Sequence, residues 1–325
     1  MKVLVLGGTG YIGARLCAQL RQTGWAQPVS VSSARRAGAA DLALDTRDGA
    51  ALQAALQEVD AVVNCVAGNA AAIAEGARVL ADAALAAGCL RIVHLSSMSV
   101  YGVQEGELTE QAPTDPTLGW YGKAKCEAEG HMQRFAGAGG CAVLLRPGCV
   151  WGPGSQLWVT RIGQWLRSGR IGDLGAAGDG WSNLVHVDDV CRAILAALRL
   201  PLAARGFRSF NLAAPDSPRW NDYFVDLALA IHATPVRRVH PMQVRLDAWL
   251  GGPPLQLARS LLARTGRSAR HLPSPVTPGL LGLWQRHLRL DSTLAERQLQ
   301  PAWTPYDTAL EQAASWFLQH EARAA

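Results

Sequence analysis

The feature that most constrains the fold is a regular alternation of short apolar runs and alanine-rich segments over the first 150 residues. The apolar runs predict strands at 2–7, 28–33, 41–45, 61–67, 91–97 and 142–148. The segments between them predict helices near 12–23, 49–58, 72–87 and 120–137. The strands are nearly continuous apolar runs, as expected where helices cover both faces of a sheet. The pattern therefore predicts an α/β fold with a doubly wound parallel sheet.

The turn after the first predicted strand is rich in glycine. Gly7, Gly10 and Gly13 are spaced G-x-x-G-x-x-G and enclose Tyr11 and Ile12. Glycine permits a tight turn, a close approach of a diphosphate to the backbone, and packing of the helix on the strand. The N-terminus of the next helix offers N–H groups and the positive end of its dipole to phosphates. The turn predicts a dinucleotide site of the Rossmann type; the alternative is a turn with only a structural role.

The second half of the chain differs in composition. Ten of the eleven tryptophans lie from Trp120 onward, where glycine and proline are also frequent. A strand–helix piece at 183–198 and a strand at 207–213 are predicted to return to the main sheet. We therefore predict a dinucleotide-binding domain over 1–150 with returning segments near 183–213. The remainder of 151–325 is predicted to be mainly a smaller, discontinuous substrate-binding region.

Bulk composition excludes several classes of protein. The chain has 325 residues, 49% of them hydrophobic, and no apolar run approaches the 18 residues of a membrane span. The seven cysteines include no C-x-x-C pair, which favours a reducing compartment and a cytoplasmic location over a disulfide framework or a zinc site. No ligand spacing indicates a metal. A net charge of +5 suits an anionic cofactor and is too diffuse to predict nucleic-acid binding.

Tyr121 and Lys125 are four residues apart in GWYGKAKCEAE, so a helix places them on one face. Alone, the pair decides nothing, but it belongs to an ordered series of motifs. The series comprises GGTGYIG (7–13), LALDTRD (42–48), NCVAG (64–68), HLSSMSVYG (94–102), YGKAK (121–125), RPGCVWGPG (146–154), LVHVDDV (184–190), FNLA (210–213) and WTPYDTALEQAASWF (303–317).

With these motifs the chain resembles the extended short-chain dehydrogenase/reductase family. Relatives include sugar-nucleotide epimerases, and the pattern is nearest to 3β-hydroxysteroid dehydrogenases and dihydroflavonol reductases. The resemblance covers most of the chain except roughly 220–290. It implies a Rossmann fold, a nicotinamide cofactor, and a small-molecule substrate bound by a monomer or homodimer.

The resemblance also implies a catalytic set. Tyr121 would donate its proton to a carbonyl oxygen in reduction, or accept one from an alcohol in oxidation. Lys125 would hold the nicotinamide ribose and, with the oxidised nicotinamide, lower the phenol pKa. Ser97 aligns with the Ser/Thr that hydrogen-bonds the reacting oxygen. The alternative is that Ser96, Ser97 and Ser99 only cap the end of a strand.

Other positions match cofactor contacts of the family. Relatives contact adenine and line the cofactor at positions that correspond here to Asp45, Thr46, Val66, Ala67, Pro147 and Gly148. Enzymes that choose NAD usually carry an acidic residue at the end of the second strand. Ser32 or Ser33 stands there, and Arg35 and Arg36 follow. A guanidinium grips a phosphate through paired hydrogen bonds, so we predict NADP, with NAD still possible.

Departures from the family pattern make some of the family's reactions less favoured for this chain. Met98 and Ser99 follow Ser97, where dehydratases carry an Asp-Glu pair, so dehydration is disfavoured. Ser182 replaces an arginine that holds the diphosphate of nucleotide sugars, and Ile73 replaces a common asparagine. We predict an alcohol–carbonyl oxidoreductase with a bulky or apolar substrate. The alternatives are a nucleotide-sugar epimerase or reductase with bound NAD, and a non-catalytic cofactor-binding sensor.

The remaining motifs favour structural roles. Asp188 and Asp189 are interpreted as helix-capping residues, and His186 as a core histidine. A tryptophan every seven residues (Trp151, Trp158 and Trp165) indicates a packed stripe more than a pocket. The leucine-rich segment 246–290 carries Arg259, Arg264, Arg267, Arg270, Arg286 and Arg289. It is interpreted as a helical subdomain with a basic face, and less readily as a lid or a membrane-surface patch.

Overall fold

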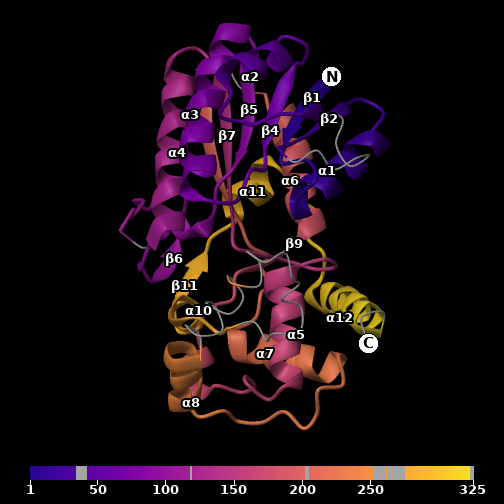
Figure 1. Cartoon of the computed structure of the whole chain (residues 1–325), viewed down its shortest axis with the longest axis vertical. Helices are drawn as coiled ribbons and strands as arrows, with labels where there is room; N and C mark the ends of the chain where they lie inside the picture. The colour runs from indigo at the N-terminus through magenta and orange to yellow at the C-terminus, as the bar shows by residue number, and fades with distance from the viewer. Residues whose placement is uncertain (34–41, 118, 202–204, 252–260, 262–274, 323–325) are drawn as a thin grey trace. The chain divides into compact units, whose positions relative to one another are not determined.

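The computed structural model describes residues 1–33, 42–117, 119–201, 205–251, 261 and 275–322. The chain divides into two compact units (Figure 1). Unit 1 comprises Met1–Gly148, Val185–Pro215 and Leu290–Thr304. Unit 2 comprises Cys149–Leu184, Asp216–Arg289 and Pro305–Ala325.

Unit 1 is built on a seven-stranded sheet with the order β10–β7–β5–β4–β1–β2–β3, in which neighbouring strands are parallel. The strands are β1 (Lys2–Leu6), β2 (Gln27–Ser32), β3 (Leu42–Ala43), β4 (Ala61–Asn64), β5 (Arg91–Leu95), β7 (Cys141–Pro147) and β10 (Phe207–Leu212). They correspond to the apolar runs of the sequence, and β4 and β7 are buried along their whole length. The predicted doubly wound α/β fold is confirmed.

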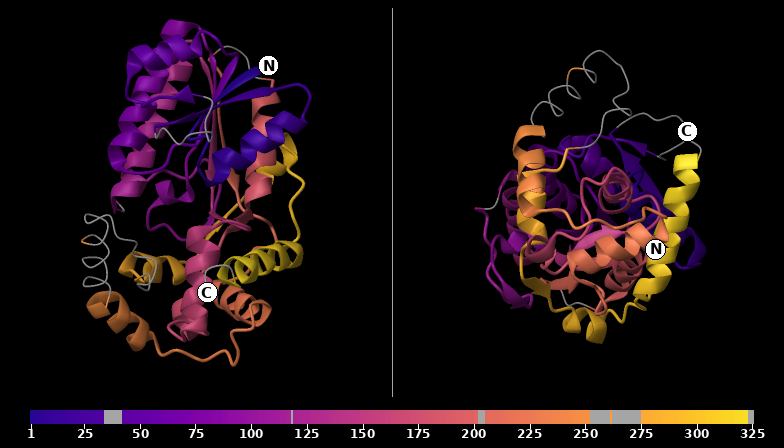
Figure 2. Two further views of the ribbon diagram at one scale, coloured as in Figure 1. Left: turned by 45° about the vertical axis from the view of Figure 1, so that its right-hand side comes forward. Right: turned by 90° about the horizontal axis from the view of Figure 1, so that it is seen from below.

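Helices cover both faces of this sheet (Figures 1 and 2). One face carries α2 (Gly49–Leu56), α3 (Ala70–Ala87) and α4 (Gly119–Gly137), and the other carries α1 (Tyr11–Gln22) and α6 (Val187–Arg199). Capping fixes their ends: Asn69 Oδ1 accepts from the Ala72 N–H at 2.9 Å, and Gly88 closes α3 at φ 73°. The helices thus begin and end close to the predicted positions.

The core beneath α3 and α4 is formed by small and aliphatic side chains. Leu80, Ala84 and Ala128 pack toward the strand residues Val62 and Ile92, and all five are at most 1% exposed. Alanine lets the two helices approach closely. On α4, polar Lys125 and Glu129 are also buried in this face.

One predicted strand differs from the structure. The piece at 183–198 forms β9 (Leu184–His186) and α6, but β9 lies outside the seven-stranded sheet, whereas β10 joins it beside β7. The strand is short because His186 already acts as the N-cap of α6, so extended backbone ends after three residues. Unit 1 also contains η1 (Met98–Tyr101), β6 (Gly106–Leu108) and α11 (Thr293–Gln298).

Unit 2 is built from short helices and strands. They are β8 (Cys149–Trp151), η2 (Gln156–Arg161), α5 (Ile162–Arg167), η3 (Gly175–Gly178), α7 (Trp220–Ala230), α8 (Pro241–Leu246), η4 (Asp247–Gly251), α10 (Pro278–Trp284), β11 (Leu288–Leu290) and α12 (Tyr306–Ala322). In the part of the chain that the structure describes, no helix is long and apolar enough to cross a membrane.

Aromatic side chains form the core of unit 2. Trp151 and Trp165 of the predicted stripe are 2% and 1% exposed, so they are core residues. Trp165 meets Trp284 with ring centroids 6.2 Å apart, and half-buried Trp158 lies 5.2 Å from Trp220. Of the basic residues in segment 246–290, Arg259, Arg264, Arg267 and Arg270 lie outside the described residues.

Candidate active site

The candidate active site lies at the carboxyl ends of the unit 1 strands. Because the strands are parallel, the segments that follow β1, β4, β5 and β7 all emerge at one edge of the sheet. The strand order reverses at β1, which lies between β4 and β2. Open α/β sheets bind ligands at such a reversal, outside the carboxyl ends of the strands. The glycine turn after β1 and Ser97 after β5 both belong to this edge.

The glycine turn has the geometry of a phosphate cradle. Gly7 has φ +75°, and a Cβ at Gly13 would lie 2.2 Å from the Gly7 carbonyl oxygen. The Gly10 N–H donates to that same oxygen at 2.9 Å. Gly10 is the N-cap of α1 and supplies no side chain to cap the first turn. The turn therefore requires glycine, and its geometry fits a dinucleotide diphosphate.

Ser97, Tyr121 and Lys125 are brought together. Ser97 lies two residues after the end of β5, and its Oγ accepts from the Ser99 N–H at 3.2 Å. Tyr121 lies in the first turn of α4, and its phenol is near enough to the Ser97 side chain for Ser97 to lower its pKa. One turn further along α4, the Lys125 Nζ lies 5.8 Å from the centroid of the Tyr121 ring. The set places two hydroxyl groups and one ammonium group side by side.

Lys125 is held in an unusual setting for a lysine. Lys125 is only 2% exposed, and its Nζ donates to the Leu95 carbonyl oxygen at 2.7 Å. Burial lowers the pKa of Lys125 to about 8, and the nearby Glu129 carboxylate acts in the opposite direction. The ammonium form therefore prevails at neutral pH and is lost as the pH rises above about 8.

The phenol of Tyr121 is largely withdrawn from solvent. Burial raises the pKa of Tyr121 above its ordinary value, and the Ser97 side chain only partly offsets this effect. The lowering expected when the oxidised nicotinamide is bound beside Lys125 stays a prediction. A phenol with a raised pKa stays protonated at neutral pH, which suits a proton donor.

A buried polar network adjoins these three residues, and sequence reasoning missed it. Glu129 accepts from the Ser96 hydroxyl at 2.5 Å and from two Arg146 nitrogens, Nε at 2.9 Å and Nη2 at 2.6 Å. Arg146 Nη1 donates to the Tyr101 hydroxyl at 2.9 Å. The signal available in the sequence was the spacing of Glu129, four residues after Lys125 and so on the same face of α4.

The residues expected to contact the cofactor have diverse local partners. Ser32 ends β2 and accepts from the Thr9 hydroxyl at 3.0 Å. A side-chain hydrogen bond from Arg47, at 2.8 Å, lowers the pKa of Asp45. Thr46 faces Gly76 of α3. Four further positions follow β4 or lie at the end of β7: Val66, Ala67, Pro147 and Gly148.

Backbone contacts set the conformation of two of these segments. The Val66 N–H donates to Asn64 Oδ1 at 3.0 Å, and the Gly148 N–H donates to the Leu212 carbonyl oxygen at 2.9 Å. The segments after β4 and β7 are thereby fixed at the same edge of the sheet as the glycine turn. Arg35 and Arg36 lie outside the described residues.

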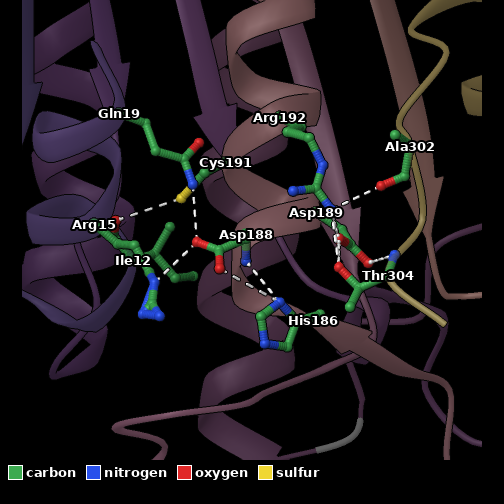
Figure 3. A network of polar contacts seen from close by, with 10 residues as sticks. All are labelled: Ile12, Arg15, Gln19, His186, Asp188, Asp189, Cys191, Arg192, Ala302 and Thr304. Atoms are coloured by element: carbon green, nitrogen blue, oxygen red, sulfur yellow. Dashed lines mark hydrogen bonds and ion pairs between the residues drawn. The ribbon is translucent and has the colours of Figure 1, made fainter. Parts of the chain in front are cut away.

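Asp188 and Asp189 lie in the first turn of α6, and both side chains bind partners that hold the fold together (Figure 3). Asp188 accepts from Arg15 Nε at 2.9 Å and from Gln19 Nε2 at 2.8 Å, which ties α6 to α1. His186, 2% exposed, caps the helix: its Nδ1 accepts from the Asp188 N–H at 3.3 Å. These contacts hold α1, the helix that begins at the glycine turn.

Asp189 is fully buried. It accepts from the Thr304 hydroxyl at 2.6 Å and from the Thr304 N–H at 3.1 Å, and it forms an ion pair with Arg192. Arg192 also donates to the Ala302 carbonyl oxygen at 2.7 Å. We call Asp189, Arg192 and Thr304 the Asp189 network.

Two positions that depart from the family pattern have structural roles. Ser182 is fully buried, and its Oγ donates to the Pro218 carbonyl oxygen at 2.6 Å and lies 2.9 Å from Ser217 Oγ. Ile73 is 2% exposed and packs in the core beneath α3. Neither position presents a charged or amide group to a ligand. Among the described residues, no cluster of three or more His, Cys, Asp or Glu side chains is arranged to hold a metal ion.

Several known proteins are similar to this chain in sequence. The model of the NAD dependent epimerase/dehydratase family matches residues 3–213. Protein YeeZ of Escherichia coli K12 is 27% identical over 256 residues, which cover 72% of this chain and 86% of YeeZ. A 3-diazoavenalumate denitrifying reductase of Streptomyces is 32% identical over 224 residues, covering 61% of this chain and 72% of that protein. A 2-alkyl-3-oxoalkanoate reductase of Stenotrophomonas maltophilia is 30% identical over 227 residues, covering 60% and 64%.

Solved structures show the same fold. MoeE5 in complex with UDP-glucose and NAD superposes with a TM-score of 0.72 at 21% identity, covering 99% of this chain and 100% of that one. The UDP-glucose 4-epimerase of Thermotoga maritima gives 0.71 at 19% identity, with coverage of 99% and 100%. At this level of identity the likeness concerns the fold alone.

Proposed function

The chain belongs to the NAD dependent epimerase/dehydratase family, and on that premise we propose that it transfers hydride between a nicotinamide cofactor and the carbonyl or secondary alcohol of a bulky or apolar small molecule. Two of its relatives are named reductases, and this chain is an enzyme of this NAD dependent family. The observation that carries the proposal is the juxtaposition of Ser97, Tyr121 and Lys125, with the Lys125 Nζ 5.8 Å from the centroid of the Tyr121 ring.

The proposed roles follow from the chemistry of the three side chains. In reduction, the substrate carbonyl oxygen accepts a hydrogen bond from Ser97 and a proton from the Tyr121 phenol. The phenolate that remains is favoured by the positive charge of Lys125. The nicotinamide, when bound, supplies the hydride. Gly7, Gly10 and Gly13 hold the diphosphate at the start of α1, and Lys125 contacts the adjacent ribose.

Carbonyl reduction is favoured over the other reactions of the family. Two relatives at 30% and 32% identity are named reductases, and one of these names specifies a 3-oxoalkanoate, a ketone on an alkyl chain. Met98 and Ser99 carry no acid–base pair for dehydration. The nucleotide-sugar alternative is disfavoured because this chain has Ser182 where those enzymes carry an arginine. The non-catalytic alternative does not explain why Tyr121 and Lys125 are both present.

NADP is the proposed cofactor. β2 ends at Ser32 without the carboxylate that binds the ribose of NAD, and Arg35 and Arg36 follow in the sequence. Replacing both arginines by alanine should raise the Michaelis constant for NADP by about tenfold or more, since charge-assisted hydrogen bonds to a phosphate are lost, and should leave that for NAD nearly unchanged. Arg47→Ala, which removes an exposed arginine paired with Asp45, is the matched control. Tighter binding of NAD than of NADP by the wild-type protein would contradict the proposal.

A substrate panel tests the reaction. NADPH oxidation would be followed at the nicotinamide absorbance with 2-alkyl-3-oxo acids, aromatic ketones, steroids, flavonoids and UDP-sugars. We expect turnover with apolar ketones and none with UDP-sugars. Interconversion of UDP-sugars without net oxidation of the cofactor would overturn the proposal in favour of epimerisation.

A further inference from the structure

We propose that Glu129, together with Ser96 and Arg146, positions the active site by holding Ser97 and by sustaining the charge of Lys125. This inference rests on the proposed function of Ser97, Tyr121 and Lys125. We call Ser96, Tyr101, Glu129, Arg146 and Asn211 the Glu129 network.

The Glu129 carboxylate accepts three hydrogen bonds, one from Ser96 after β5 and two from Arg146 of β7. Its Oε1 accepts from the hydroxyl of Ser96, directly after β5, and from Arg146 Nε of β7, and its Oε2 accepts from Arg146 Nη2. The side chains of Arg146 and Glu129 are only 7% and 8% exposed. A planar guanidinium that binds both carboxylate oxygens fixes orientation as well as distance. The turn of α4 that follows Lys125 is therefore locked to the ends of two strands.

The network also holds the segment that carries Ser97 at both ends. Ser96 immediately precedes Ser97, and Tyr101 ends the short turn that follows it. The Tyr101 hydroxyl accepts from Arg146 at 2.9 Å and donates to Asn211 Oδ1 at 2.6 Å. Tyr101 and Asn211 are fully buried. The position of the Ser97 hydroxyl relative to Tyr121 thus depends on bonds made on either side of it.

The charge environment of Lys125 makes a second consequence testable. The groups that face it are His94 of β5, Cys65 after β4, and Tyr121 and Glu129 of α4. Burial holds the pKa of His94 well below its usual range and raises that of Cys65 to about 12, so both are neutral near pH 7. Among these described groups, Glu129 supplies the negative charge that opposes the effect of burial on Lys125.

The substitution Glu129→Gln distinguishes the effect of the Glu129 charge from the effect of its side-chain shape. The amide keeps the volume and one acceptor oxygen but removes the negative charge, so the pKa of Lys125 should fall by at least about 0.5 below its wild-type value. The alkaline limb of the pH–kcat profile should move to lower pH by the same amount. A merely structural role would lower kcat equally at every pH and leave the limb where it is.

Lysine-selective NMR measures this pKa without any substrate. The chain has only three lysines, Lys2, Lys123 and Lys125, so isotope-labelled lysine gives three signals, and Lys123→Arg assists their assignment. In Glu129→Gln, the signal of Lys125 should titrate at lower pH while the other two are unchanged. Asp82→Asn, which removes an exposed carboxylate paired with Arg78, is the matched control and should alter none of them.

The proposed carbonyl reduction and the proposed positioning role of Glu129 can be refuted independently of each other. If the wild-type enzyme reduces no carbonyl compound, the proposed function falls, but the titration of Lys125 still decides the role of Glu129. An unchanged Lys125 pKa in Glu129→Gln would overturn the positioning proposal. If that variant does not fold, Arg146→Lys keeps a cation beside Glu129 without the paired geometry; a kcat equal to wild type would then overturn the proposal, and a fall of about tenfold or more would support it.

Discussion

Two buried carboxylates on opposite faces of the unit 1 sheet are bound in similar ways and act on different parts of the molecule. Glu129, on the face covered by α4, is held by Arg146 and by the hydroxyl of Ser96. Asp189, on α6 at the other face, is held by Arg192 and by the hydroxyl of Thr304. Both combine a guanidinium with a hydroxyl donor.

The difference lies in what each carboxylate adjoins. Glu129 is one turn from Lys125, and its partner Ser96 is next to Ser97, so a change there reaches the reacting groups. The Asp189 network joins α6 to the segment around Thr304 (Figure 3). Among the described residues, its hydrogen-bond partners include neither Tyr121 nor Ser97. Burial and pairing are common to both carboxylates and therefore do not distinguish them. What distinguishes Glu129 is that it adjoins the proposed catalytic residues Ser97 and Lys125. Substitutions on the α4 face should therefore change rates, and substitutions in the Asp189 network should change stability.

The largest effect is expected on the α4 face. Tyr121→Phe removes the proton donor while it keeps the ring, so turnover should fall by about 100- to 10,000-fold with cofactor affinity close to wild type. Lys125→Met should differ because it also weakens cofactor binding. Steady-state kinetics and cofactor titration measure both. Retention of most of the wild-type rate by the phenylalanine variant would refute the catalytic assignment.

Asp189→Asn tests the other face. The amide cannot balance Arg192 and brings N–H groups toward the Thr304 donors, so stability should fall by about 2–3 kcal/mol. For a domain of this size the thermal midpoint would drop by roughly 5–10 °C. Turnover per folded molecule and its pH profile should stay at wild-type values. An unchanged midpoint with a shifted pH profile would place Asp189 in the chemistry and break the contrast between the two networks.

Neighbouring serines sharpen the contrast within the α4 face. Ser97→Ala removes a donor to the reacting oxygen and should lower kcat by about 10- to 100-fold. The Ser99 hydroxyl is buried and has no hydrogen-bond partner among the described residues, so Ser99→Ala should change kcat by less than about twofold. Equal losses in the two variants, measured with the same substrate, would mean that the strand end is only structural.

Much of unit 1 was predictable because its signals are local. Apolar runs identified the strands of the sheet, and glycine spacing identified the turn before α1. The resemblance to extended short-chain dehydrogenases/reductases is confirmed by the family match over residues 3–213, while the nearer likeness to 3β-hydroxysteroid dehydrogenases and dihydroflavonol reductases stays a prediction. β9 was misplaced because a three-residue apolar run does not reveal which sheet it joins.

The Glu129 network was not predictable from local patterns. Its central carboxylate is 33 residues from Ser96 and 17 from Arg146, and the three meet only when β5, β7 and α4 pack together. The same holds for the raised pKa of Tyr121, since burial of the phenol is a property of the assembled fold. The sequence placed Tyr121 and Lys125 on one helix face but carried no measure of how deeply each is buried.

The central claim, that Tyr121 assists hydride transfer to a carbonyl, is tested most directly by isotope transfer. The enzyme would be incubated with NADPH deuterated at the transferable position and a 2-alkyl-3-oxo acid, and the product analysed by mass spectrometry. We expect deuterium on the carbinol carbon with the wild-type enzyme, and at least about a hundredfold slower label transfer with Tyr121→Phe. A wild-type product without deuterium, or equal rates of labelling by the two proteins, would contradict the account.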